Sequence, residues 1–146
     1  MAPPSVGSKA VFRVMDLVSV TMELPDQYPL VTLQEAEAPL RVLSFRIGLP
    51  EGVALSYAAR RLSTPRPLTH DLFSTVLQRL GADVVAVRLT GRQGTTYTAE
   101  LDIMSQRGRE VLPCRPSDGL ILAARQAVPA PMLADQRLLA QGGDVA

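Results

Sequence analysis

The chain has 146 residues, of which 47% are apolar and 20% are charged, and its formal net charge is +1. These values describe one globular domain with enough apolar side chains for a core, and they exclude a disordered chain and a strongly basic nucleic-acid-binding face. The single cysteine, Cys114, excludes an intramolecular disulfide, and no apolar run approaches the ~20 residues that span a bilayer. Because the N-terminus also lacks the pattern of a signal peptide, we expect a cytoplasmic protein with no membrane partner.

The first half of the chain predicts a run of strands followed by a run of helices. Valine-rich and alternating segments separated by proline-containing turns favour strands, and apolar residues at helical spacing follow them. The predicted strands are 9–22, 30–35 and 40–48, and the predicted helices are 50–62 and 69–81. We expect the three strands to form an antiparallel meander.

The second half repeats this order. The predicted strands are 83–91, 95–105 and 109–114, with a hairpin turn at "GRQG", and the predicted helices are 117–127 and 131–141. The resulting order βββααβββαα predicts an α+β fold in which helices pack on a mixed or antiparallel sheet. We expect one domain over 9–141, with flexible tails at 1–8 and 142–146.

Two predicted helix starts contain the same types of residue in the same order. "RPLTHDL" (66–72) and "RPSDGL" (115–120) each have an arginine, a proline, a hydroxyl residue and an acid. Thr69 and Ser117 are expected to be N-caps, and an acid in the first turn stabilises a helix by about 0.5 kcal/mol. In this interpretation both segments serve local stability alone.

A functional interpretation accounts for the same residues. Arg66 and Arg115 lie just before helix N-termini, where backbone N–H groups and arginines together form a phosphate-sized anion site. His70, the only histidine, can exchange a proton near neutral pH. Carboxylates at helix starts could hold Mg²⁺ or Mn²⁺, and the candidates are Glu51, Asp71 and Asp118.

The sequence also resembles a known family. The segments "RVLSFRIGLPEGVAL" (41–55), "RPLTHDLFSTVLQRLGADVVAVRL" (66–89), "TYTAELDI" (96–103) and "RPSDGLILAARQAVPAPMLADQRL" (115–138) are similar, in sequence and in spacing, to the bifunctional nuclease domain family. The chain departs from the family pattern at Leu43–Gly48, at Gly52 and at Pro113, where the family commonly has an acid.

The resemblance implies an α+β domain that often self-associates and is associated with cleavage of DNA and RNA. It carries over a set of polar residues: Glu51, Arg66, Thr69, His70, Asp71, Arg115, Ser117 and Asp118. We assign catalysis to His70, Asp71 and Asp118, substrate binding to Arg66, Arg115, Thr69 and Ser117, and metal binding to Glu51, Asp71 and Asp118. Two alternatives stay open on the same scaffold, a non-catalytic oligomerisation module and an anion- or nucleotide-binding regulatory domain.

Overall fold

A computed structural model describes residues 10–139, so the predicted tails at 1–8 and 142–146 lie outside the described residues. The strands are β1 (Phe12–Thr21), β2 (Leu30–Glu35), β3 (Val42–Arg46), β4 (Asp83–Gln93), β5 (Thr96–Ser105), β6 (Gly108–Cys114) and β7 (Met132–Asp135). The helices are α1 (Leu49–Ala59), α2 (Thr69–Arg79) and α3 (Pro116–Ala124), and a 3₁₀ turn, η1, covers Gln136–Leu138. The predicted α+β class is confirmed, and most predicted elements lie within a few residues of the observed ones.

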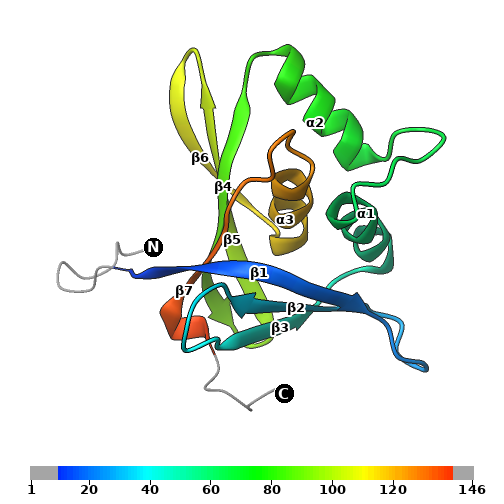
Figure 1. Cartoon of the computed structure of the whole chain (residues 1–146), viewed down its shortest axis with the longest axis vertical. Helices are drawn as coiled ribbons and strands as arrows, with labels where there is room; N and C mark the ends of the chain where they lie inside the picture. The colour runs from blue at the N-terminus through cyan, green and yellow to red at the C-terminus, as the bar shows by residue number, and fades with distance from the viewer. Residues whose placement is uncertain (1–9, 140–146) are drawn as a thin grey trace.

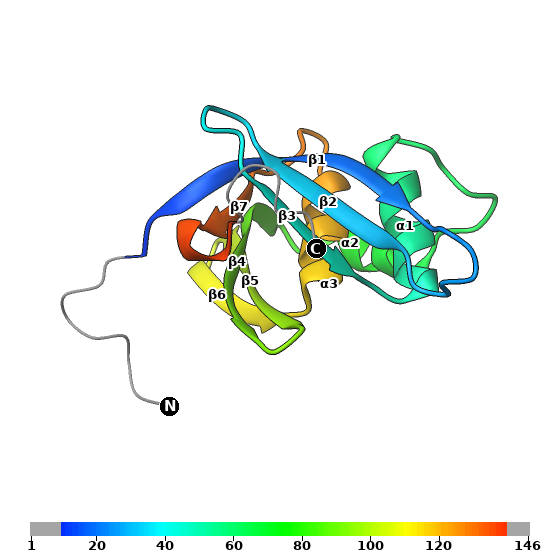
Figure 2. The same ribbon diagram turned by 90° about the horizontal axis from the view of Figure 1, so that it is seen from below.

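One mixed sheet contains all the strands, in the order β3-β2-β1-β7-β4-β5-β6. The first three strands form the expected antiparallel meander, and β4, β5 and β6 form a second one. Strand β7 lies between the two meanders, antiparallel to β1 and parallel to β4 (Figure 1). The sheet therefore joins the two halves of the chain through its last strand, and Figure 2 shows how strongly it twists.

Helix α3 lies at the centre of the helical layer. It packs against β4 and β5, and both α1 and α2 pack against it (Figure 1). Leu120 and Ile121 on α3 are completely buried together with Leu55 on α1 and Val87 on β4. None of the helices in residues 10–139 is long and apolar enough to cross a membrane.

The predicted final helix at 131–141 is wrong. Residues 132–135 instead form β7, the 3₁₀ turn η1 follows, and residues 140–141 lie outside the described part of the chain. A short apolar run cannot be assigned to helix or strand by its period alone, and here pairing with strands on both sides decides the outcome. The predicted turn "GRQG" also shifts, because β4 continues to Gln93 and Gly94 takes the left-handed conformation at the turn.

Helix α2 is attached to the domain by its more polar side. Its large apolar residues are exposed, with relative exposures of 59% for Leu72, 49% for Phe73, 47% for Val76 and 75% for Leu80. Among the large apolar residues of α2 itself, only Leu77, at the edge of this face, packs against the core. An outward apolar face on a helix of a globular domain indicates a surface that contacts another molecule.

Candidate functional site

The first turns of all three α-helices bring polar side chains to one place. Glu51 is the third residue of α1, His70 is the second residue of α2, and Asp118 is the third residue of α3. Arg115 is the N-cap residue of α3. We call these four residues the helix-start cluster.

Arg115 and His70 connect the members of the cluster. Arg115 donates to Asp118 from Nε and from Nη2, both at 2.8 Å, and it donates from Nη1 to Glu51 Oε1 at 3.0 Å. The Nε2 atom of His70 lies 2.8 Å from Asp118 Oδ1. His70 and Asp118 are 48 positions apart in the sequence, so only the packing of α2 against α3 brings them together.

The cluster keeps its charged groups charged. Burial opposes ionisation of Asp118, but hydrogen bonds from Arg115 and His70 outweigh it, so the pKa of Asp118 lies below its ordinary value. Hydrogen bonds to Asp118 and then to Glu51 raise the pKa of Arg115. Its side chain is 61% exposed, so the guanidinium is accessible to a ligand as well as to the two carboxylates.

The cluster borders an open pocket of about 460 Å³. The lining residues are Pro50, Glu51, Val53, Ala54, Leu68, Thr69, His70 and Arg115. Gly48, the N-cap of α1, sets the position of Glu51, because a Cβ at residue 48 would lie only 2.9 Å from Glu51 Oε1. A side chain at residue 48 would therefore push the carboxylate away from Arg115.

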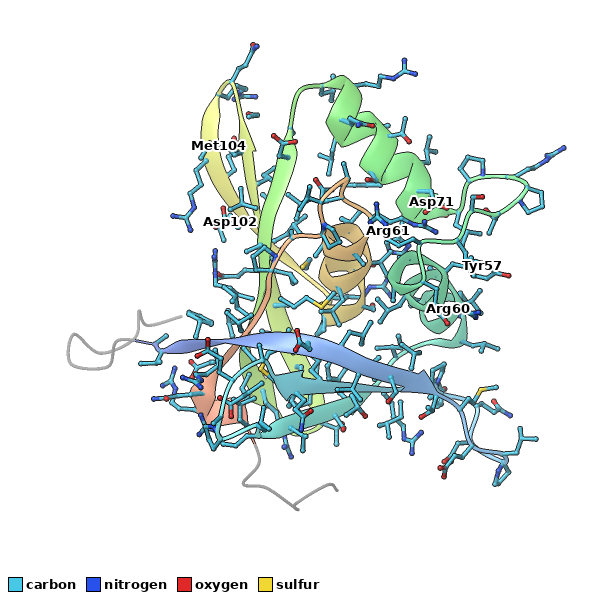
Figure 3. The ribbon with its side chains drawn as sticks, in the orientation of Figure 1. Tyr57, Arg60, Arg61, Asp71, Asp102 and Met104 are labelled. Carbon is cyan, nitrogen blue, oxygen red and sulfur yellow. The ribbon has the colours of Figure 1, made fainter. Side chains whose placement is uncertain are left out.

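Asp71 does not join the cluster. Its Oδ2 accepts a hydrogen bond from the backbone N–H of Leu68 at 2.9 Å, and its Oδ1 forms an ion pair with Nε of Arg125 at 2.7 Å. Arg125 is the C-cap residue of α3, so Asp71 links the start of α2 to the end of α3. Figure 3 shows Asp71 on the first turn of α2. The expected meeting of Asp71 with Asp118 is therefore not found.

The four residues that were expected to bind substrate do not all lie at the pocket. Thr69 and Arg115 line the pocket. Arg66 is exposed in the loop before α2, and its side chain makes no hydrogen bond or ion pair within residues 10–139. Ser117 is only 5% exposed and lies inside the domain, away from the pocket lining.

The predicted N-caps are wrong. The N-cap residues are Leu68 for α2 and Arg115 for α3, and neither helix has a side-chain cap from the predicted hydroxyl. In α2 the carboxylate of Asp71 binds the N-cap N–H instead, which is one half of a capping box. In α3 the first residue is Pro116, which has no N–H that requires a partner.

The three carboxylates that were expected to hold Mg²⁺ or Mn²⁺ are not arranged for it. Arg115 lies between Glu51 and Asp118, and Asp71 faces Arg125. Across residues 10–139, no group of three or more His, Cys, Asp and Glu side chains has the geometry to hold an ion. A trio of Glu51, Asp71 and Asp118 therefore does not fit this arrangement.

The fully buried acids serve the fold. Glu35 accepts from Arg13 and Arg41, which joins β1, β2 and the turn before β3. The hydrogen bond from Arg41 outweighs the effect of burial and lowers the pKa of Glu35 to about 2. Asp102 is held by two arginines in the same way, and Figure 3 shows it on the side of the sheet away from α3. Both carboxylates have less than 4% exposed side-chain area, whereas the helix-start cluster is open to a pocket.

Cys114, at the end of β6, has a structural role. Burial, and then the charge of Asp118, raise the pKa of its thiol to about 11, which leaves it protonated at neutral pH. The thiol packs beside Gly119 at the start of α3. It therefore carries no nucleophilic chemistry.

Sequence reasoning missed two features near the site. Arg125, the partner of Asp71, follows a helix without any local motif, so only the fold reveals the pair. The proline-containing turn before β2 predicts no groove, yet this loop and the start of α1 form one beside the pocket. Exposed Leu24 and Tyr28 within that turn were the available signal.

Comparisons with known proteins identify the family of the chain. The model of the bifunctional nuclease domain matches residues 31–144. Two proteins of Mycobacterium tuberculosis, the uncharacterized protein MT1877 of strain CDC 1551 and the uncharacterized protein Rv1829 of strain H37Rv, are each 34% identical over 127 residues. Each match covers 87% of this chain and 74% of the relative. This chain therefore belongs to the bifunctional nuclease domain family.

Proposed function

We propose that this protein cleaves phosphodiester bonds of DNA and RNA at the helix-start cluster. The observation that carries the proposal is the meeting of Glu51, His70, Arg115 and Asp118 at the first turns of three helices, beside an open pocket. Membership of a nuclease family agrees with this chemistry. The proposal assigns a separate task to His70, Arg115 and Asp118, and Glu51 is a carboxylate partner of Arg115.

Phosphate binding is supported by the electrostatics of the helix starts. With His70 neutral, the cluster has a net charge of −1, from Glu51, Asp118 and Arg115. Each helix N-terminus carries about half a positive elementary charge, so three of them outweigh the net side-chain charge. In our proposal Arg115 exchanges one carboxylate partner for a phosphate oxygen, and the Thr69 hydroxyl donates to a second one. Arg66, exposed on the adjacent loop, is proposed to contact a flanking phosphate.

His70 is assigned the role of general base. A carboxylate only accepts hydrogen bonds, so the contact with Asp118 places the proton of neutral His70 on Nε2. The other ring nitrogen, Nδ1, then has a free lone pair that can take a proton from water. Asp118 is a positioning residue in this scheme, because it fixes the tautomer and the orientation of the ring.

The proposed hydrolysis proceeds in one displacement. His70 Nδ1 takes a proton as the water oxygen forms a bond to phosphorus. The bond from phosphorus to the leaving oxygen breaks, and that oxygen then receives a proton from the His70 imidazolium or from solvent. Arg115 stabilises the negative charge on the phosphoryl oxygens during the displacement. No step in this scheme is assigned to the carboxylate trio, which does not fit a metal ion as arranged.

The test is a cleavage assay with the purified protein. Single-stranded DNA and RNA are incubated with the wild type and with a His70→Ala, Asp118→Ala double variant, each with Mg²⁺, with Mn²⁺ and with EDTA. The proposal expects cleavage by the wild type and none by the variant. Cleavage that persists in the variant would come from a contaminant and would sink the proposal. Salt-sensitive binding of a nucleotide without cleavage would favour the regulatory anion-binding alternative.

We also propose that α2 contacts a second copy of this chain. The support is its outward apolar face, formed by Leu72, Phe73, Val76 and Leu80. Such a face can pack against its own copy about a two-fold axis. Light scattering after size exclusion tests this, because Phe73→Ser is expected to reduce the mass to that of one chain.

Cytoplasmic location, which the single free cysteine supports, is likewise proposed.

A further inference from the structure

A second concave surface adjoins the pocket of the helix-start cluster. The groove has a volume of about 780 Å³ and lies between the loop that joins β1 to β2 and the start of α1. Its lining residues are Met22, Leu24, Pro25, Asp26, Gln27, Tyr28, Gly48, Leu49 and Pro50. Pro50 also lines the pocket beside His70 and Arg115, so the two concave surfaces are neighbours.

The groove wall is apolar and exposed. Leu24 is 86% exposed, Tyr28 is 60% exposed, and Met22 and Leu49 are each 46% exposed. Large apolar side chains left this open, on one concave surface beside a candidate site, indicate a ligand with a flat or apolar part. The exposed ring of Tyr28 is the type of surface on which an unpaired base stacks.

An ion pair lies beside the groove, between Asp26, which lines it, and Arg46, which does not. Arg46 donates from Nη1 to the backbone carbonyl of Tyr28 at 2.9 Å, which holds the loop in place. Its Nη2 lies 3.4 Å from Asp26 Oδ2 in an ion pair that is about half exposed. An ion pair as exposed as that of Arg46 and Asp26 contributes little free energy, so Arg46 can bind a phosphate of the ligand instead.

We infer that the groove is a base-binding subsite, in which an unpaired nucleobase stacks on Tyr28 while the adjacent phosphate lies at Arg115. The inference rests on the proposed function and deepens it by naming the substrate class, a nucleic acid strand with unpaired bases. A base inside a duplex is already stacked and paired, so it cannot enter the groove unless the duplex opens. The protein is therefore expected to prefer single strands to duplexes of the same sequence.

The test compares strands with and without bases. The probes are a fluorescently labelled single-stranded DNA and a strand of the same length built from abasic tetrahydrofuran residues, which carries the same phosphates. Tyr28→Ala is expected to weaken binding of the base-containing strand between about 5-fold and 150-fold, the range for loss of one stacked base. The same variant is expected to leave the affinity for the abasic strand unchanged.

Two matched variants complete the design. Tyr28→Phe keeps the ring and is expected to bind as the wild type does. Tyr57→Ala removes an exposed tyrosine outside the groove, on the side of α1 turned away from α3 (Figure 3), and is also expected to have no effect. Arg115→Gln is expected to weaken binding of both strands, because it acts on phosphate.

The outcomes separate the two proposals. If the wild type binds and cleaves DNA but Tyr28→Ala has the same affinity for the base-containing strand as the wild type, the groove inference is overturned and the proposed function stands. If Tyr28→Ala weakens binding of both strands equally, the inference is also overturned, because the loop would then contact the sugar-phosphate backbone and not the base. Absence of binding and cleavage in the wild type overturns both proposals.

Discussion

Helices α2 and α3 begin with the same types of residue but occupy opposite environments. Seven of the nine residues of α3 are buried, whereas none of the eleven residues of α2 is. In α3 the motif arginine is itself the N-cap and its side chain enters the cluster. In α2 one residue, Leu68, separates Pro67 from the first helical residue, so Arg66 remains outside in the loop. A shared motif therefore does not place its arginine at the same position relative to the helix.

The two motif acids also differ in what they bind. Asp71 and Asp118 are each the third residue of their helix. Asp71 binds its own N-cap N–H and Arg125, whereas Asp118 binds Arg115 and His70. The start of α3 therefore gives the cluster Arg115 and Asp118, whereas the start of α2 gives it His70 alone. Four measurements test this division between the two helix starts.

The largest effect is expected on cleavage. His70→Ala removes the proposed general base and should reduce the cleavage rate by about 10²–10⁴-fold. Asp118→Asn, which loses the carboxylate that orients His70, should reduce the rate with no change in fold. Asp71→Asn is the matched variant at the other helix start and should keep wild-type cleavage, measured as initial rates on labelled single-stranded DNA. A loss in Asp71→Asn as large as that in Asp118→Asn would contradict the division.

The next effect concerns stability and distinguishes the buried helix from the exposed one. Leu120→Ala empties a fully buried position in α3 and should lower the free energy of unfolding by about 2–5 kcal/mol. Leu80→Ala, at the exposed end of α2, should change it by less than about 0.5 kcal/mol. Urea denaturation of both variants measures the difference. Similar losses would show that α2 is buried in solution, as it would be in a stable assembly of copies.

A smaller effect is expected at the capping contact of α2. Asp71→Ala removes the acceptor of the Leu68 N–H and the ion pair with Arg125, at a cost of about 1 kcal/mol to α2. Hydrogen exchange should therefore be roughly fivefold faster for amides in α2 and unchanged in α3. Asp83→Ala, an exposed acid at the start of β4, is the control. Faster exchange across both helices would mean that Asp71 supports the whole helical layer.

The smallest effect is a pH dependence at Asp118. Its pKa is depressed in the folded protein, so it contributes stability above its ordinary value of 3.8 and loses that contribution as the pH falls through the folded pKa. Asp118→Asn should therefore lose less stability than the wild type on acidification below that value. Urea midpoints across this range measure the change. Identical acid profiles would show that the Arg115 and His70 contacts do not favour the charged carboxylate.

The fold was largely predictable because its signals are local. Alternating valines, proline-containing turns and helical spacing locate β1 to β6 and the three helices with small errors at the ends. Strand β7 was not predictable, because its four residues form a strand only when β1 and β4 lie on either side. A local pattern cannot contain that information.

The site was predictable in its membership and less so in its geometry. The paired motifs and the family resemblance pointed to His70, Arg115 and Asp118, which do meet. They also pointed to Asp71, which the sequence places directly after His70. Neighbouring residues in the first turn of a helix point in directions about 100° apart, so adjacency in sequence separates these two side chains in space.

The position of β7 has a consequence for how the chain folds. Strands β1 and β4 stay unpaired on their inner edges until residues 132–135 have left the ribosome, so neither half of the sheet can be completed during synthesis of the other. The two meanders therefore become one sheet only after residues 132–135 pair with β1 and β4. Until that pairing forms, the inner edges of β1 and β4 carry unpaired backbone groups, which are a template for pairing with another strand.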